Sequence, residues 1–317
     1  MIFNIENIKL SPICSRNNDL DLSVIMDLKT SNDIHENLIN TGNKIVTARK
    51  MGASVILMMG AHIIRSGVQR YIIDLMKRGF ISCIATNGAG LIHDFELALI
   101  GATTENVAHY IKDGRFGMWE ETGQINDIVN RTFRNGSGMG HSVGQAISNG
   151  NFPNKDISIL AQAVKYNVPV TVHVGIGQDI IHQFPNFDGA ATGAASYKDF
   201  LTFAGVVQNL ENGVVMNFGS AVMAPEVFLK ALSMSRNIAR QQGESIARFT
   251  TLVCDLHKLP DDYSKEAPKD SAAYYFRPWK TMLVRTVADE GESFYVRGHH
   301  AKTIPALWTS INQAEKA

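Results

Sequence analysis

Residues 86–94 read Thr86-Asn87-Gly88-Ala89-Gly90-Leu91-Ile92-His93-Asp94, after a short apolar run at 81–85 and before a pattern typical of a helix. A strand that ends in small residues and then opens a helix is the local shape that receives phosphates in many α/β proteins. Glycine lets the backbone approach a ligand closely, and the free N–H groups at a helix start attract anions. The same pattern also forms tight turns that bind nothing. The stretch therefore predicts an α/β fold and leaves its ligand open.

Strand-like and helix-like segments alternate on both sides of this turn. The sequence predicts strands at 55–60, 81–85, 168–174, 213–219, 247–254, 282–287 and 293–296, and helices at 33–50, 66–78, 94–100, 157–166, 199–207, 225–241 and from 305 onward. Short connections between strands and helices favour a mainly parallel sheet with right-handed crossovers. We expect a Rossmann-like, doubly wound α/β fold with helices on both faces of the sheet. The glycine-rich segment 101–155 predicts loops and short helices, with a flexible loop at 136–141, and 255–273 predicts a long loop.

Composition limits the classes of function. Of the 317 residues, 45% are hydrophobic and 19% are charged, so the chain has enough apolar side chains for a full core. No linker divides it, and we expect an N-terminal arm at 1–40 and a single domain at 41–317. Thirty basic and thirty acidic residues give no electrostatic reason to expect nucleic acid or a membrane as partner. Three scattered cysteines, no signal peptide and no membrane span favour a cytoplasmic protein.

Several segments resemble the deoxyhypusine synthase family in order and spacing. They are 47–50, 60–67, 86–94, 167–170, 175–180, 213–220 and 277–280, and they extend over most of residues 40–310. Enzymes of that family bind NAD, oxidise spermidine and transfer its aminobutyl group through an enzyme-lysine imine to a protein lysine. The resemblance implies NAD as cofactor, bound near subunit interfaces of a homotetramer. By position, the cofactor-binding residues would be Ser66, Gly67, Thr86, Asn87, Gly88 and Asp94. For Asp94, a role at the start of its helix is the equal alternative.

The chain departs from the family pattern at the positions of the chemistry. Ile92 and His93 replace two acidic residues, and Thr281 stands where the family has its imine-forming lysine, with Lys280 one residue early. On an extended segment this shift would turn the side chain to the other face unless a bulge restored it. With carboxylates lost and positive charge at Arg277 and Lys280, we expect a neutral or anionic substrate rather than spermidine. Lys280 is the candidate catalytic amine, with Trp279 and Arg277 as substrate contacts; a lysine lying along the surface is the alternative.

A second cluster follows the strand at 168–174. His173, Asp179 and His182 lie at a carboxyl edge, where α/β sheets bind ligands. Asp179 and His182 are candidates for proton transfer, and His173 for substrate contact. A metal set is the alternative, but no flanking Glu-x-x-His or cysteine pattern supports one, so no metal is predicted. Ordinary surface or buried histidines are the remaining possibility.

Three functions fit these observations. The first is a NAD-dependent transferase of the deoxyhypusine synthase type, which dehydrogenates a small amine or related substrate and transfers a group, with or without a Lys280 imine. The second is an ornithine cyclodeaminase-like enzyme that recycles NAD, in which Arg277 would hold a substrate carboxylate. The third is a non-catalytic assembly protein that binds NAD or another ligand. The sequence does not name the substrate.

Overall fold

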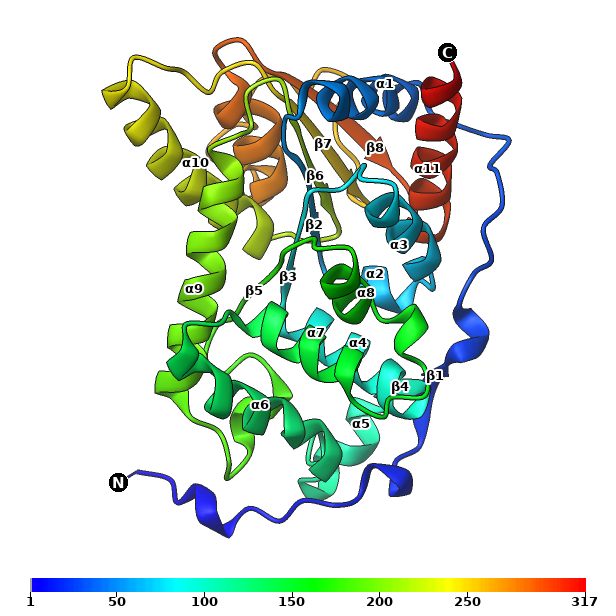
Figure 1. The fold of residues 1–317 in the computed structure, drawn as a ribbon, viewed down its shortest axis with the longest axis vertical. Coiled ribbons are helices and arrows are strands. Elements are labelled where there is room, and N and C mark those ends of the chain that lie inside the picture. Colours follow the sequence, from blue (N-terminus) through cyan, green and yellow to red (C-terminus); the bar gives the residue numbers. More distant parts are fainter. Residues whose placement is uncertain (1) are drawn as a thin grey trace.

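The computed structural model describes residues 2–317 and has a six-stranded parallel sheet at its centre (Figure 1). The strand order is β5-β3-β2-β6-β7-β8, so the chain builds outward from β2 in one direction and from β6 in the other. This is the predicted doubly wound arrangement. The strands of the sheet are β2 (Val55–Met59), β3 (Cys83–Asn87), β5 (Val170–His173), β6 (Val214–Phe218), β7 (Thr250–Asp255) and β8 (Glu292–Arg297).

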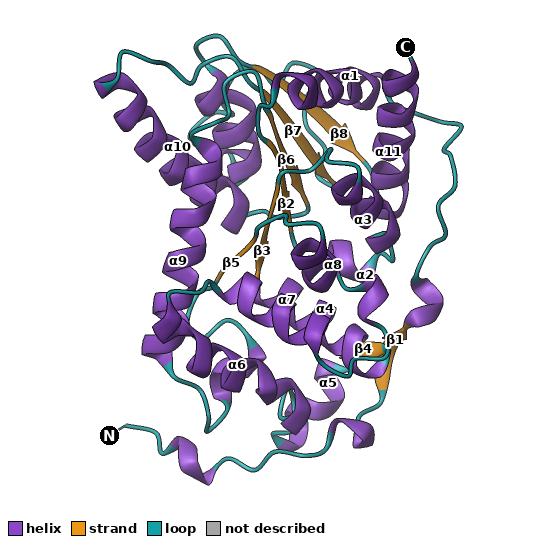
Figure 2. Ribbon diagram, in the orientation of Figure 1, coloured by secondary structure: helices purple, strands orange, loops and turns teal. Residues whose placement is uncertain are grey.

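Helices cover both faces of this sheet (Figure 2). They are α1 (Glu36–Met51), α2 (His62–Arg65), α3 (Gln69–Lys77), α4 (Gly88–Ile100), α5 (Val107–Tyr110), α6 (Gln124–Thr132), α7 (Met139–Asn149), α8 (Ile159–Lys165), α9 (Gly189–Val207), α10 (Met223–Gln241) and α11 (His300–Lys316). Side chains of β2 alternate between the faces: Val55, Leu57 and Met59 pack with α1, α4 and α11, and Ile56 and Met58 pack with α9 and α10. Because both faces are covered, the strand is apolar throughout.

The segment before α1 is held against the main body. Strand β1 (Asn18–Asp21) pairs antiparallel with β4 (Ala102–Glu105), and Arg16 forms a buried, two-pronged ion pair with Glu96 of α4. Both N···O distances are 2.9 Å, and the side chains are 1% and 2% exposed. Hydroxyl groups of Thr103 and Thr122 also donate to the Glu96 carboxylate. Each oxygen of the Glu96 carboxylate thus accepts two hydrogen bonds.

Three buried aspartates each occupy the amino end of a helix from another part of the chain. Asp94 accepts hydrogen bonds from Ser158, Ile159 and Leu160 at the start of α8. Asp199 accepts from Gly140 in the first turn of α7 and from Val172. Asp179 lies against the start of α4. Burial raises the pKa of Asp94 and Asp179 to about 6 and that of Asp199 to about 7, although the backbone donors oppose the shift.

Several elements differ from the sequence prediction. Helix α4 begins at Gly88 instead of 94, because the Asn87 side chain accepts from Gly90 N and caps it. The expected strand at 282–287 is wrong: 278–284 form a π-helix and 285–287 a 3₁₀ turn. A short apolar run does not distinguish a strand from a buried helix. The expected flexible loop at 136–141 instead ends in α7, which starts at Met139.

The Arg16–Glu96 pair gives a stability prediction. Arg16→Ala leaves the Glu96 carboxylate buried without its counter-ion, which costs about 3–5 kcal/mol. Urea unfolding should therefore show a large loss of stability. Arg115→Ala removes an arginine from the exposed pair with Asp113 and serves as the control, with little expected change. Equal effects of the two substitutions would contradict the assignment of Arg16 as the anchor of the arm.

Asp199 gives a prediction on pH. Its folded pKa of about 7 lies above the ordinary 3.8, so the native state holds this proton across that window. The raised pKa of Asp199 contributes to the free energy of unfolding in full below about pH 4. This contribution, at most about 4 kcal/mol, is lost as the pH rises through 7. Asp199→Asn, which cannot ionise, should flatten the fall of the unfolding free energy between pH 5 and 8. Asp94 and Asp179 keep their own part of the slope. An unchanged slope in chemical denaturation would contradict the prediction.

Candidate functional site

Strands are added to the sheet on one side of β2 and then, from β6 onward, on the other side, so the switch point lies between the parallel strands β2 and β6. The carboxyl ends of these two strands lie close together. A Cβ built on Gly60, after β2, would lie 2.3 Å from the carbonyl oxygen of Gly219, after β6. Gly219 has a φ of 66°, which side chains disfavour, and a Cβ there would lie 2.5 Å from His300 Nε2. Ligands of open α/β sheets bind outside the carboxyl ends of the strands at such a switch point.

A cavity of about 660 Å³ opens there, which we call the switch-point cavity. Its walls are the carboxyl ends of β2, β3, β5 and β6 and the start of α10. It is lined by Gly60, Ala61, His62, Asn87, Ala89, His173, Val174, Gly175, Gln178, Gly219, Ser220, Ala221, Val222, Met223, Glu226 and Val227. Much of this wall is backbone and small side chains, which suits close contact with an extended ligand.

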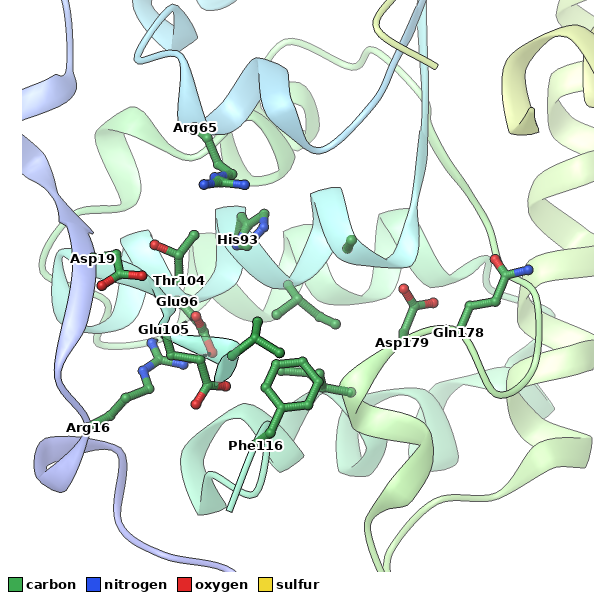
Figure 3. A pocket seen from close by; sticks show the side chains of 14 residues that line it. Arg16, Asp19, Arg65, His93, Glu96, Thr104, Glu105, Phe116, Gln178 and Asp179 are labelled. Carbon is green, nitrogen blue, oxygen red and sulfur yellow. Dashed lines mark hydrogen bonds and ion pairs between the residues drawn. The ribbon is translucent and has the colours of Figure 1, made fainter. Parts of the chain in front are cut away.

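Two smaller cavities share lining residues with the switch-point cavity. One, of about 310 Å³, shares His62 and Gly219 and extends to Ser66, Asp255, His299 and His300. The other, of about 330 Å³, shares Ala89 and Gln178, and we call it the arm cavity (Figure 3). It is lined by Arg16, Asp19, Arg65, Ala89, Ile92, His93, Glu96, Thr104, Glu105, Val107, Phe116, Gln178, Asp179 and Ile180. The three cavities together follow the carboxyl edge from β7 to the arm.

The amino end of α4, expected to receive a phosphate, is filled by the protein itself. The Asp179 carboxylate accepts from Ala89 N, and a Cβ on Gly88 would lie 2.1 Å from Asp179 Oδ2. The side-chain oxygen of Asn87 accepts a hydrogen bond from Gly90 N. Gly88 therefore makes room for Asp179, which corrects its expected contact with a cofactor. The Asp179 carboxylate replaces an external anion at this helix start.

His182 lies beside Asp179 on the short turn Ile180–Gln183. Its Nδ1 accepts from the N–H groups of Gly177 and Asp179, both at 3.1 Å, so we assign the proton to Nε2. Nε2 is buried without a hydrogen-bond partner among the described residues and lies 3.8 Å from Asp179 Oδ2. Burial lowers the pKa of His182, so the ring is neutral. The structure thus brings together a carboxylate that titrates near neutrality and a neutral imidazole N–H, as acid–base chemistry requires.

His173 ends β5 and lines the switch-point cavity. Its Nε2 is 3.0 Å from Thr171 Oγ1, and its ring packs edge-on against Phe203. Burial lowers the pKa of His173 to about 4, so it presents a neutral ring to a ligand. His173, Asp179 and His182 do not form a metal site, since no group of three potential ligands comes together among residues 2–317.

The predicted cofactor residues divide into two groups. Asn87 lines the switch-point cavity and Ser66 the adjoining one, where its hydroxyl donates to His62 O. Gly67 instead packs under the arm, where a Cβ would lie 1.8 Å from Val24 O. Thr86 is buried at the end of β3.

Asp94 requires the clearest correction. It is buried, and its carboxylate is committed to the start of α8, as described above. It lines none of the three cavities, so the structure gives no support to the expected cofactor contact. The alternative, a role at the start of its own helix, is wrong: α4 begins at Gly88, and the Asp94 carboxylate accepts from the start of α8 instead.

Arg277, Trp279 and Lys280 lie outside these cavities. Lys280 Nζ is 4.0 Å from the centroid of the Tyr274 ring, and Trp279 Nε1 donates to Tyr263 O. Arg277 pairs with Glu226, which itself lines the switch-point cavity. Because this segment is helical rather than extended, the one-residue displacement of Lys280 does not turn the side chain to the opposite face.

The polar residues of the arm cavity were not predicted from the sequence. Arg16 and Glu105 come from segments expected to be arm and loop, and their partners are 80 and 14 residues away. One signal was available: Glu96 interrupts the apolar run of α4, and a carboxylate there needs a buried partner.

Comparison with known proteins shows the fold of the chain. No family model matches, and no curated protein matches. Among solved structures, AgrE in complex with ornithine and NAD⁺ is similar at a TM-score of 0.50 and 13% identity, over 91% of this chain and 34% of that chain. A "conserved putative LOR/SDH protein" from Methanococcus maripaludis S2 is similar at a TM-score of 0.50 and 15% identity, over 92% of this chain and 74% of that chain. A "putative deoxyhypusine synthase" from Entamoeba histolytica has a TM-score of 0.45 and 11% identity, over 87% of this chain and 86% of that chain.

The likenesses to AgrE and to the LOR/SDH protein agree with the α/β fold that the resemblance implied. The chain spans about a third of the length of AgrE and of ArgZ, a cyanobacterial arginine dihydrolase. None of the helices formed by residues 2–317 combines the length and apolar character needed to cross a bilayer. The chain therefore shares its fold with about a third of AgrE.

Proposed function

We propose that this chain is a NAD-dependent enzyme with a deoxyhypusine synthase-like fold, which dehydrogenates a small amine or related substrate and transfers or releases the product. The observation that carries the proposal is the open switch-point cavity, walled by backbone at Gly60–Ala61 and Gly219–Ala221. The likeness in fold to AgrE, crystallised with NAD⁺, supports the choice of cofactor.

In this proposal, the start of α10 takes the place of the filled start of α4 as the phosphate-facing corner. Ala221, Val222 and Met223 line the cavity where α10 begins; the N-cap residue, Val222, makes no side-chain capping bond, and Ser220 Oγ accepts from Ala224 N in the first turn. The partial positive charge of a helix start favours an anion there. Asn87 and Ser66 would contact the cofactor from the neighbouring strand end and cavity.

Substrate chemistry would take place toward Asp179. NAD⁺ would supply the acceptor for a hydride leaving the substrate carbon. Asp179, with its pKa near 6, would accept the proton that leaves the substrate nitrogen or oxygen. His182 would hold the Asp179 loop through its two backbone hydrogen bonds, and neutral His173 would contact the ligand.

A covalent role for Lys280 has less support from the geometry. Its ammonium group lies over Tyr274, and Trp279 and Arg277 are committed to Tyr263 and Glu226. An imine would require Lys280 to leave Tyr274 and enter the switch-point cavity. Proton transfer by Asp179 requires no such rearrangement, since Asp179 already lines a cavity.

An ornithine cyclodeaminase-like reaction is the second candidate, favoured by the ornithine bound in AgrE. Here the carboxylate of the substrate needs a cation. Arg277 is paired with Glu226, whereas Arg65 lines the arm cavity and forms no ion pair within residues 2–317, so Arg65 suits that role better. Formation of proline and ammonia from ornithine with NAD⁺ would select this reaction over group transfer.

The assembly and compartment belong to the same proposal. Tyr197 and Leu201 of α9 and Met234 and Ile238 of α10 are exposed apolar residues on packed helices, which suits burial in a homotetramer. Cys14, Cys83 and Cys254 are free, which suits the reducing cytoplasm.

NAD⁺ binding is tested by thermal unfolding. Millimolar NAD⁺ should raise the Tm by several degrees, because a ligand that binds only the native state stabilises it. Ala221→Asp places a negative charge at the exposed start of α10 and should abolish this shift. Ala190→Asp makes the same change at the exposed start of α9, outside the cavities, and should preserve it. The proposal fails if wild-type protein shows no shift.

A further inference from the structure

Thr171 and His173 lie on one face of β5, at its carboxyl end. Side chains two residues apart on a strand point to the same side of the sheet, and Thr171 Oγ1 is 3.0 Å from His173 Nε2. Thr171 is 0% exposed, whereas His173 lines the switch-point cavity. In the proposed function His173 contacts the ligand and Thr171 has no part. Within residues 2–317, however, the Thr171 hydroxyl is the hydrogen-bond partner of the His173 ring.

The Thr171 hydroxyl has one proton and two neighbours that are able to accept it. Besides His173 Nε2, the hydroxyl oxygen lies 3.3 Å from the carbonyl oxygen of Ile84 on β3, which only accepts. If the proton pointed at His173, these two oxygens would face each other with no proton between them and would repel. If the proton points at Ile84, the hydroxyl oxygen accepts from His173 Nε2–H, and both contacts are hydrogen bonds. Because buried polar groups are normally paired, the second arrangement is the stable one.

This arrangement fixes which nitrogen of His173 carries the proton. Burial lowers the pKa of His173 to about 4, so the ring is neutral and has one N–H and one lone pair. With the proton on Nε2, the lone pair is on Nδ1. Nδ1 makes no hydrogen bond within residues 2–317, and unlike Nε2 of His182 it is not enclosed by protein. His173 therefore presents a hydrogen-bond acceptor to the switch-point cavity.

An acceptor at this place suits a neutral N–H donor of the bound ligand. Asn87, opposite His173 in the pairing of β3 with β5, lines the same cavity, and Asp179 lies beyond Ala89 and Gln178. In the proposed function the phosphates lie at the start of α10 and substrate chemistry takes place toward Asp179. The nicotinamide ring would then lie between them, at the ends of β3 and β5. Its carboxamide carries two N–H donors.

We infer that Thr171 is a positioning residue, whose hydroxyl holds the proton of His173 on Nε2 so that Nδ1 accepts a hydrogen bond from the carboxamide of the nicotinamide ring. The identity of the ligand rests on the proposed function, whereas the tautomer rests on the contacts of Thr171 alone. With the other tautomer, the N–H on Nδ1 would face the N–H of the carboxamide and disfavour the ligand. A held carboxamide also fixes which face of the nicotinamide ring is turned toward the substrate.

The first test determines the tautomer in the absence of any ligand. Long-range ¹H–¹⁵N correlation spectra distinguish the protonated from the unprotonated nitrogen of the His173 ring, whose signals are assigned by their loss in His173→Asn. We expect the proton on Nε2 in the wild-type protein and in Thr171→Ser, which keeps the hydroxyl. Thr171→Val keeps the shape of the side chain without the hydroxyl, and should move the proton to Nδ1 or divide it between the nitrogens. A proton on Nδ1 of the wild-type protein would overturn the inference.

The second test compares, by calorimetry, NAD⁺ with its acetylpyridine analogue, which has a methyl ketone in place of the carboxamide and so lacks the N–H donors. The wild-type protein should bind NAD⁺ about tenfold more tightly, since the analogue leaves Nδ1 unpaired. Thr171→Val should remove this preference by weakening NAD⁺ binding alone, and Thr171→Ser should keep it. Thr251→Val is the control, because it removes an equally buried strand hydroxyl, which donates to Met282 O outside the cavities, and it should leave both affinities unchanged.

Equal affinity of the wild-type protein for the two dinucleotides, or an unchanged preference in Thr171→Val, would reject this inference and leave the dinucleotide site in place. No binding of NAD⁺ to the wild-type protein would reject the proposed function, and the carboxamide contact with it. If Thr171→Val does not fold, the tautomer of the wild-type protein and its preference between the two dinucleotides decide.

Discussion

Buried carboxylates at helix starts are the interaction on which this architecture depends. Asp94, Asp179 and Asp199 each connect a helix to a segment distant in sequence, and each is desolvated enough to raise its pKa. A carboxylate at a helix start satisfies N–H groups that lack partners within the helix. The same contact therefore fixes the orientation of the helix and places a titratable group beside the carboxyl edge of the sheet.

The carboxylates at helix starts also determine where an external anion is able to bind. With Asp179 at the start of α4, a phosphate there would meet a like charge at close range. The start of α10, beside Gly219, is lined by Ala221 and Val222, and the carboxylate in its first turn, Glu226, is paired with Arg277 and Lys230. The turn that looked most suitable from its glycines is thus closed, because Gly88 accommodates a side chain rather than a ligand.

The sequence predicted the fold better than the site. Apolar runs such as 55–59, bounded by glycine turns, specify buried parallel strands through local composition alone, and β2 lies where it was expected. The apolar run at 282–287 failed because its helical state is set by packing. The role of Asp94 could not be predicted for a related reason. Its hydrogen-bond partners are 64 to 66 residues away in the sequence, and no local pattern specifies contacts at such a separation.

The acidic residues absent from positions 92 and 93 have counterparts elsewhere in the same region. Glu96 is one helical turn beyond Ile92 and lines the same cavity, but Arg16 of the arm neutralises it. Glu105 follows on β4, whose pairing with β1 brings Asp19 to the same cavity. The free charge of the cavity thus depends on how the arm is anchored: without Arg16, Glu96 would add a further uncompensated carboxylate. Arg16 therefore both anchors the arm and lowers the net negative charge of the cavity.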